Sequence, residues 1–312
     1  MTELLEAVRF VHFAAAMAVF GIGAFRLYAF ASDMRSAPAP ARVALDRALA
    51  RLMTTGAALA LLSALAMVPC VAAEMAAMTS AAVDPVILRV VLSATEFGHV
   101  WCWHIGFAVA LVVLCLVPRR SGQVAASTAA SLLLLVSLAW VGHATMDMGG
   151  VAVHAVNQMV HLTAAGVWFG GLVPLGILLR RATRPEGAQY VPLARTALPH
   201  FSQMGYVAVA LVALTGLINS VFLIGSMKAL VTTPYGQLLI VKVALFAIMV
   251  CLALVNRFRL MPRLRDAAIT STALRALFRS VAAEQALGLA ILAVVAVLGT
   301  WEPAIHITVK MR

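Results

Sequence analysis

Residues 8–30 read VRFVHFAAAMAVFGIGAFRLYAF, an apolar run with few polar interruptions. A helix rises about 1.5 Å per residue, so roughly 20 apolar residues cross a hydrocarbon layer about 30 Å thick. The run is continuously apolar rather than alternating, which excludes a membrane β-strand. Glu3 and Glu6 precede it without the basic flank of a secretory signal. The stretch therefore predicts a membrane-spanning helix that stays in the protein.

Seven further runs of this kind follow along the chain. They cover approximately residues 52–73, 86–117, 124–143, 155–179, 203–224, 238–255 and 281–299. The run at 86–117 is longer than a bilayer requires, which predicts a helix that is tilted or extends beyond the membrane. Of the 312 residues, 63% are apolar and only 11% charged, whereas a soluble domain carries about 25% charged residues. The sequence predicts an all-α integral membrane protein with eight transmembrane helices.

Basic residues gather on one side of the predicted membrane. Seventeen of the 23 Lys and Arg residues fall in or beside the connections after the first, third, fifth and seventh runs. By the positive-inside rule these connections are cytoplasmic and both termini are periplasmic. The formal net charge of +11 is then a topology signal, so we expect no nucleic-acid partner.

An internal repeat is visible at an offset of 149 residues. Residues 12–21 read HFAAAMAVFG and residues 161–170 read HLTAAGVWFG, so His, two Ala, Phe and Gly coincide. The same offset pairs Gly56 with Gly205, and Asp84-Pro85 with Thr233-Pro234. We interpret the chain as two parallel four-helix repeats, a first half over residues 1–149 and a second half over residues 150–312.

Histidine and methionine are the most frequent potential metal ligands near the predicted outer surface. An ionisable side chain inside a membrane span costs several kcal/mol unless it is paired, so each is a functional candidate. Imidazole and thioether groups together form a donor set that suits copper. The candidate metal ligands are His12, His99, His143, Met146, Met148, His154 and His161.

Spacing supports part of this set. His154, Gln158 and His161 are spaced i, i+4 and i+7, which predicts one stripe on a helix. A second outer group with weaker spacing consists of Met67, Cys70, Met75 and Met78. The alternative is structural, since methionine commonly fills apolar gaps and a single buried histidine can be satisfied by a Ser, Thr or backbone partner.

Other polar residues and absent motifs narrow the function. Asn219, Lys242 and Glu284 could form a polar path through the second half, or cross-link helices, while Lys242 and Glu284 could also reach the two membrane surfaces. The sequence has no phosphate-binding loop, nucleophile elbow or HExxH motif, which excludes an ATP-driven pump on this chain alone. We expect a transporter-like protein rather than an enzyme.

Several ordered motifs resemble the CopD family of copper resistance and copper homeostasis membrane proteins. They are Gly142-His143-Ala144, the segment His161 to Gly171, Phe201-Ser202, Thr215 to Asn219, Tyr235-Gly236 with Lys242, Asn256-Arg257 and Glu284. The resemblance implies a bacterial inner-membrane protein that handles copper, commonly together with the periplasmic copper-binding protein CopC. This chain contains no CopC-like β-sandwich, so such a partner would be a separate protein.

Two other functions compete with copper movement across or into the inner membrane. Four-helix halves with inward histidines also describe b-type cytochromes, in which two imidazoles clamp a haem iron. His12, His99, His104 and His143 could supply such a haem b pair, making the protein an electron carrier or a cupric reductase. A third hypothesis is a membrane scaffold that docks a periplasmic partner.

Overall fold

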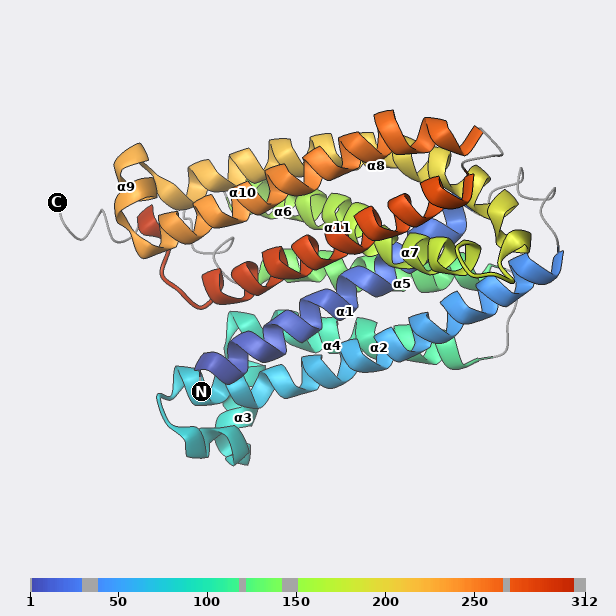
Figure 1. Cartoon of the computed structure of the whole chain (residues 1–312). Helices are drawn as coiled ribbons and strands as arrows, with labels where there is room; N and C mark the ends of the chain where they lie inside the picture. Colours follow the sequence, from blue (N-terminus) through green and yellow to red (C-terminus); the bar gives the residue numbers. More distant parts are fainter. Residues whose placement is uncertain (1, 30–38, 118–121, 142–150, 266–269, 306–312) are drawn as a thin grey trace.

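The structure is a computed structural model that describes residues 2–29, 39–117, 122–141, 151–265 and 270–305 (Figure 1). Over these residues the chain is a bundle of long helices without a strand. Eight helical stretches are long and apolar enough to cross a membrane. The all-α membrane fold with eight spans is therefore confirmed.

The first half contains four of the eight spans. Its helices are α1 (Thr2–Ala29), α2 (Ala39–Met75), the short α3 (Pro85–Ala94), α4 (Glu96–Leu116) and α5 (Gln123–Ser137). Two short 3₁₀ segments accompany them, η2 (Thr79–Val83) before α3 and η3 (Leu138–Trp140) after α5. Because α3 is too short to span, the four spans of this half are α1, α2, α4 and α5 with η3.

The single long helix predicted over residues 86–117 is wrong. The chain breaks at Thr95, which ends α3 and begins α4; its hydroxyl accepts a hydrogen bond from the Gly98 backbone N–H at 2.9 Å. Asp84 caps the start of α3 in the same way, accepting from the Val86 N–H at 2.8 Å. Side-chain caps satisfy the free N–H groups at helix starts, so the cap before the run starts a short helix and the cap at Thr95 within the run starts a separate span.

The second half contains the other four spans. One span is continuous through α6 (Val151–Ala165), the π-helical segment η5 (Gly166–Gly170) and α7 (Gly171–Ala182). The 3₁₀ segment η6 (Ala188–Tyr190) leads into α8 (Val191–Ile224), which is followed by the short α9 (Met227–Thr232). The remaining elements are α10 (Pro234–Val255), the π-helical η7 (Asn256–Leu260), the 3₁₀ segment η8 (Met261–Arg265) and α11 (Thr270–Leu298).

A short helix followed by a threonine-capped span occurs in both halves. Thr233 stands between α9 and α10 and accepts from the Gly236 N–H at 3.0 Å, as Thr95 does for Gly98. These two caps are 138 residues apart, so the pairing of Asp84-Pro85 with Thr233-Pro234 is wrong. The pairing fails because the two short helices differ in length. Asp84 precedes α3, which is longer than α9, whereas Thr233 directly precedes a span.

The glycines paired by the sequence repeat meet in space. A Cβ atom added to Gly21 on α1 would lie 2.1 Å from the carbonyl carbon of Gly170 in η5. A Cβ on Gly170 would lie 2.0 Å from the Met17 carbonyl oxygen. Small residues allow such close backbone approach between membrane helices. The first helices of the two halves therefore cross in direct backbone contact.

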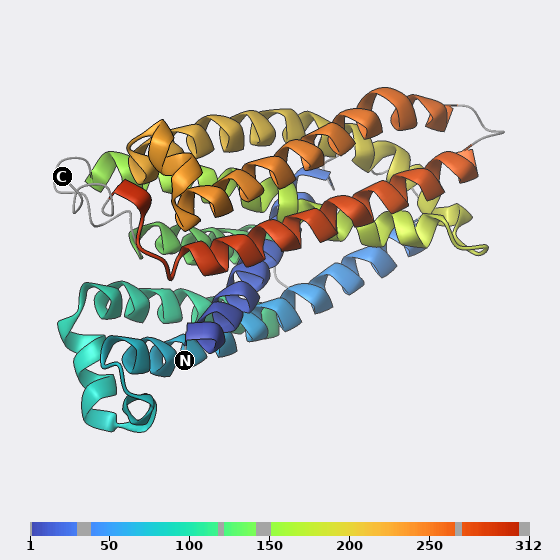
Figure 2. The same cartoon turned by 60° about the vertical axis from the view of Figure 1, so that its left-hand side comes forward.

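Helix α1 is the common packing partner of both halves. It contacts α2 and α5 of the first half and η5, α7, α8 and α11 of the second half. In Figures 1 and 2 it runs obliquely through the bundle beside α11. The core that surrounds it is continuous across the two halves.

The start of α1 and the end of α11 lie at the same end of the bundle (Figure 1). The Thr300 hydroxyl donates to Glu6 Oε1 at 2.8 Å, which ties the two ends together. At the opposite end Arg26 and Asp46 form an ion pair at 2.7 Å. An even number of spans places both termini on one side, and their assignment to the periplasm stays a prediction from the charge pattern.

Candidate metal site

Two histidines from different helices face each other inside the first half. His12 lies on α1 and His104 on α4, and their Nε2 atoms are 2.8 Å apart. Both side chains have no exposed surface. Their ring centroids are 4.8 Å apart with the planes inclined by 59°. The arrangement therefore directs the Nε2 atoms at each other.

His12 is held from behind by α2. Its Nδ1 atom lies 2.9 Å from Ser63 Oγ and 3.2 Å from the Ala60 carbonyl oxygen. The Ser63 hydroxyl donates its own hydrogen to the Leu59 carbonyl at 2.7 Å. Both neighbours therefore present lone pairs to Nδ1, so we assign the hydrogen of His12 to Nδ1 and an unprotonated lone pair to Nε2.

His104 is held in the same way by α5. Its Nδ1 atom lies 2.7 Å from Ser137 Oγ, and this hydroxyl donates to the Leu134 carbonyl at 2.8 Å. The Ser137 hydroxyl can instead donate to His104 Nδ1, in which case His104 Nε2–H donates to Nε2 of His12 at 2.8 Å. A metal ion bound between the rings would replace this shared hydrogen. Metal-ligating histidines are commonly fixed by a second-shell acceptor at the other ring nitrogen.

Trp101 closes one side of the histidine pair. Its ring stacks on His104 with centroids 4.4 Å apart and planes inclined by 13°. The indole N–H donates to the Ala64 carbonyl on α2 at 2.9 Å. Because the Trp101 side chain is held by both the stacking contact and this hydrogen bond, it separates the histidine pair from lipid and keeps His104 in its orientation.

Soft donors lead from the pair toward the end of the bundle where the termini lie. Met67 and Cys70 follow Ser63 on α2 at i+4 and i+7, so they share its face, and both are buried. Met75 and Met78 beyond them are more than half exposed. The second outer group found in the sequence thus divides into two buried and two exposed members.

The second half gives its equivalent histidine a different partner. His161 Nδ1 lies 2.9 Å from Thr215 Oγ1 on α8, and that hydroxyl donates to the Leu211 carbonyl. The anchor is therefore of the same kind as for His12. Lys242 occupies the position on α10 that His104 occupies on α4, counted from the capping threonine.

The stripe predicted on residues 154–161 packs against α8. His154 is buried and stacks on Phe222 with ring centroids 4.7 Å apart. Gln158 Oε1 accepts from Asn219 Nδ2 at 2.8 Å. Asn219 also accepts from Asn157 Nδ2 at 2.8 Å. This face of α6 is therefore joined to α8 by a network of amide hydrogen bonds.

The remaining candidates lie apart from the histidine pair. His99 is exposed on α4, and its Nε2 contacts the Ser93 carbonyl at 3.0 Å. His143, Met146 and Met148 lie outside the described residues. Within the described part of the chain no three His, Cys, Asp or Glu side chains converge on a common metal position.

Sequence reasoning placed His104 in the haem alternative and left it out of the metal set. The signal that points to it is depth: His12 lies ten residues after the start of α1, and His104 eight residues after the start of α4. Both helices start at the same end of the bundle (Figure 2). Ser63 and Ser137 had no comparable sequence signal.

The histidine pair does not fit a haem as arranged. Two axial imidazole nitrogens must lie about 4 Å apart, at about 2 Å on each side of an iron, with a macrocycle between the rings. The Nε2 atoms are 2.8 Å apart, and Trp101 stacks on His104. To hold a single metal ion, the two Nε2 atoms need to move apart by only about 1 Å, and no space for a macrocycle is required.

Comparison with known proteins gives consistent results along the whole chain. Residues 1–154 match the family model "Copper resistance protein D-like, N-terminal domain", and residues 195–298 match "Copper resistance protein D". No solved structure matches the chain.

Three known proteins are similar to most of the chain. "Inner membrane protein YebZ" of Escherichia coli (strain K12) is 34% identical over 95% of this chain and 97% of its own length. "Copper resistance protein D" of Pseudomonas syringae pv. tomato is 31% identical over 95% of this chain and 96% of its own length. "Copper transport protein CutJ" of Bacillus subtilis (strain 168) is 31% identical over 70% of this chain and 39% of its own length.

Proposed function

The chain belongs to the copper resistance protein D family, and from this premise we propose that it moves copper ions across or into the bacterial inner membrane. The eight spans and the relative named as an inner membrane protein support this location. The relatives named for copper resistance and copper transport support the cargo. Copper is in this proposal the transported ion and not a resident cofactor.

The proposal depends most on the buried pair of Nε2 atoms in the first half. Hydrogen bonds at Nδ1 orient the two rings so that Nε2 of His12 and Nε2 of His104 meet at one point. A copper ion at this point would take one nitrogen from each side at about 2 Å. Two ligands form a weak site compared with a closed cage, and transfer through a membrane needs sites that also release the ion.

Capture would take place at the outer end. His99, Met75 and Met78 are exposed there, and His143, Met146 and Met148 belong to the connection that precedes α6. Buried Cys70 and Met67 would then pass the ion along α2 to the histidine pair. His154 and His161 would offer further ligands in the second half. A separate CopC-like periplasmic protein would supply the copper.

Copper uptake into proteoliposomes tests this function. Purified protein is reconstituted in vesicles of bacterial lipid, and copper inside the vesicles is measured by mass spectrometry. We expect wild-type protein to fill the vesicles and His12→Ala to abolish uptake, because one imidazole alone no longer brackets the ion. The matched control is His200→Ala, a histidine on α8 that contacts Tyr28 and is not among the proposed ligands.

The outcomes separate clearly. Uptake by wild-type protein that His200→Ala retains and His12→Ala loses supports the proposal. Equal uptake by empty vesicles and protein-containing vesicles, or full uptake by the His12→Ala protein, would contradict it. Size-exclusion profiles of each variant show whether loss of uptake follows from loss of folding.

A further inference from the structure

Glu284 is an acidic side chain enclosed in the middle of a membrane helix. It lies fourteen residues from either end of α11 and is only 2% exposed. The carboxyl group is thus enclosed by neighbouring helices and does not extend to the surface of the bundle. Among the described residues the single ion pair is Arg26–Asp46. Glu284 therefore has no ion-pair partner in the described part of the chain.

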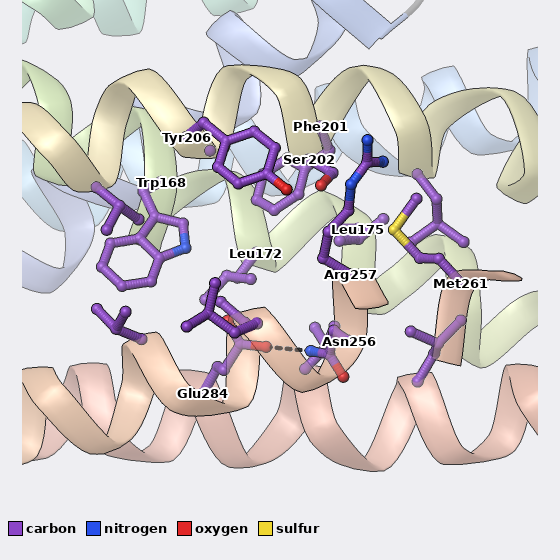
Figure 3. A pocket seen from close by; sticks show the side chains of 18 of the residues that line it. Trp168, Leu172, Leu175, Phe201, Ser202, Tyr206, Asn256, Arg257, Met261 and Glu284 are labelled. Atoms are coloured by element: carbon purple, nitrogen blue, oxygen red, sulfur yellow. Dashed lines mark hydrogen bonds between the residues drawn. The ribbon is translucent and has the colours of Figure 1, made fainter. Parts of the chain in front are cut away.

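A cavity of about 230 Å³ opens beside this carboxyl group. It lies between α8, α11 and the end of α10, with η5 and α7 on its other side (Figure 3). Most of its lining is apolar, and the polar members are Trp168, Ser202, Tyr206, Asn256, Arg257 and Glu284. The volume is enough for several water molecules, since one water needs about 10–15 Å³ on this measure.

The only hydrogen bond to Glu284 in the described structure comes from Asn256. Asn256 Nδ2 donates to Glu284 Oε1 at 2.5 Å (Figure 3). Asn256 is itself buried, and its Oδ1 atom has no hydrogen-bond partner among the described residues. Buried polar atoms are nearly always satisfied by protein or water. This orphaned acceptor therefore indicates that water or another donor enters the cavity beside Glu284.

Two π-helical segments border the same cavity. Trp168 comes from η5, and Asn256 and Arg257 come from η7. Such segments are rare and occur frequently at functional sites. Two of them from different spans, both facing one cavity, are independent evidence that this region is a site rather than a packing defect.

We infer that Glu284 is a proton-binding site that exchanges its proton with water through this cavity. In the protonated state the carboxyl group is neutral and suits its apolar surroundings, because an isolated buried charge is costly. On release, the O–H bond breaks and the proton passes to cavity water. The carboxylate left behind keeps the hydrogen bond from Asn256 and shares the cavity with the Arg257 guanidinium.

The charged and titratable groups around the site are few. Arg257 from η7 and Tyr206 from α8 line the cavity with Glu284, and the guanidinium lies 5.7 Å from the centroid of the Tyr206 ring. The cavity residues contributed by η5, α7 and η8 are Trp168, two leucines and Met261, none of which titrates. Glu284 is thus the single carboxyl group of the cavity.

Packing between η5 and α1 connects the helix segment beside this cavity with the helix that carries His12. Trp168 lies two residues before Gly170, which is in backbone contact with Gly21 on the helix that carries His12. A movement of η5 on proton release would therefore shift α1. This step rests on the copper transport proposed above. Through this contact, proton exchange at Glu284 is coupled to the movement of copper.

Infrared spectroscopy tests the proton site without copper. Spectra of the purified protein are recorded across a pH series in water and in heavy water, and the carbonyl stretch of protonated carboxylic acids is followed. We expect a band that shifts in heavy water and disappears at high pH. Glu284→Gln removes it, while the matched control Glu96→Gln, an exposed carboxyl group on α4, retains it. An identical band in the wild-type and Glu284→Gln proteins would overturn the inference.

Uptake under a pH gradient tests the coupling. One proton exchanged per copper ion changes the equilibrium accumulation ratio by about tenfold per pH unit. We expect this response in wild-type and Glu96→Gln vesicles, and copper uptake without any gradient response in Glu284→Gln vesicles. A gradient response that survives in Glu284→Gln overturns the coupling. If no protein moves copper, the proposed function fails, while the infrared band still decides whether Glu284 binds a proton.

Discussion

His12 and His161 hold matching positions in the two halves, and both are anchored through Nδ1 to a hydroxyl that donates to its own helix. The two rings differ in what lies opposite the anchored nitrogen, on the Nε2 side. The Nε2 atom of His12 meets a second imidazole, that of His104. In the second half the corresponding position on α10 is Lys242, which supplies no second imidazole.

The same arrangement of an anchored histidine on a membrane helix thus occurs in two different electrostatic environments, one around His12 and one around His161. Two imidazoles whose Nε2 atoms meet at 2.8 Å can exchange the hydrogen that they share for a soft metal ion. A single imidazole without this second nitrogen is a weaker ligand set for a cation. Copper chemistry should therefore concentrate in the first half, while α6 and α8 of the second half are joined by amide hydrogen bonds.

The largest effect is expected where the two halves meet. Gly21→Ala places a Cβ atom into the Gly170 backbone, and such overpacking costs about 3 kcal/mol or more. We expect a large loss of thermal stability in detergent, measured by the unfolding of the purified protein. Gly106→Ala is the matched control, since a Cβ there meets no atom within 4 Å. Equal stability of the two variants would contradict the crossing.

Alanine in place of each histidine tests the comparison itself. His104→Ala should weaken copper binding by more than about 100-fold, since even loss of an outer partner of a ligand costs about 10–100-fold. His161→Ala should weaken it less than about tenfold. Competition with a copper chelator of known affinity measures both. Equal losses would show that the two halves bind copper alike.

A reciprocal substitution should make the second half resemble the first. Lys242→His supplies a second imidazole opposite His161, so we expect bound copper to rise from about one to about two ions per chain. Lys242→Gln removes the charge without adding a ligand and should leave the copper content unchanged. Metal analysis after gel filtration distinguishes the two variants. No gain with histidine would contradict the proposed equivalence of positions 104 and 242.

The smallest effect concerns the anchor of the pair. Ser137→Ala removes the hydroxyl that fixes His104 and should lower copper affinity by about tenfold, the low end for an outer partner. Ser131→Ala on the same helix is the control, because its hydroxyl bonds the Thr128 carbonyl of its own helix. Chelator competition again reports the difference, and equal affinities would show that the anchor does not position the ring.

The sequence predicted the number and type of the spans because a bilayer demands long apolar helices, and this demand acts on each stretch separately. It failed at residues 86–117, where the cap at Thr95 divides one apolar run. Hydropathy does not register a cap, since a single polar side chain hardly changes the average of a window.

The candidate site was only partly visible for a related reason. His12 stood out because a charged or polar side chain in a span is costly at any helix position. Its partner His104, the serine anchors and the cavity beside Glu284 depend on which faces of which helices meet. Residue spacing along one helix fixes its own faces, but the order and rotation of helices in a bundle arise from packing between them.

Composition and local pattern alone thus determined a helical membrane protein with inward-facing histidines and, through ordered motifs, its family resemblance. Only the tertiary structure decided that two imidazoles face each other across α1 and α4, that the glycines of the repeat meet, and that Glu284 is enclosed beside a cavity. The physical reason is that burial of apolar surface acts on each segment by itself, whereas convergence of side chains requires several segments to pack in one specific arrangement.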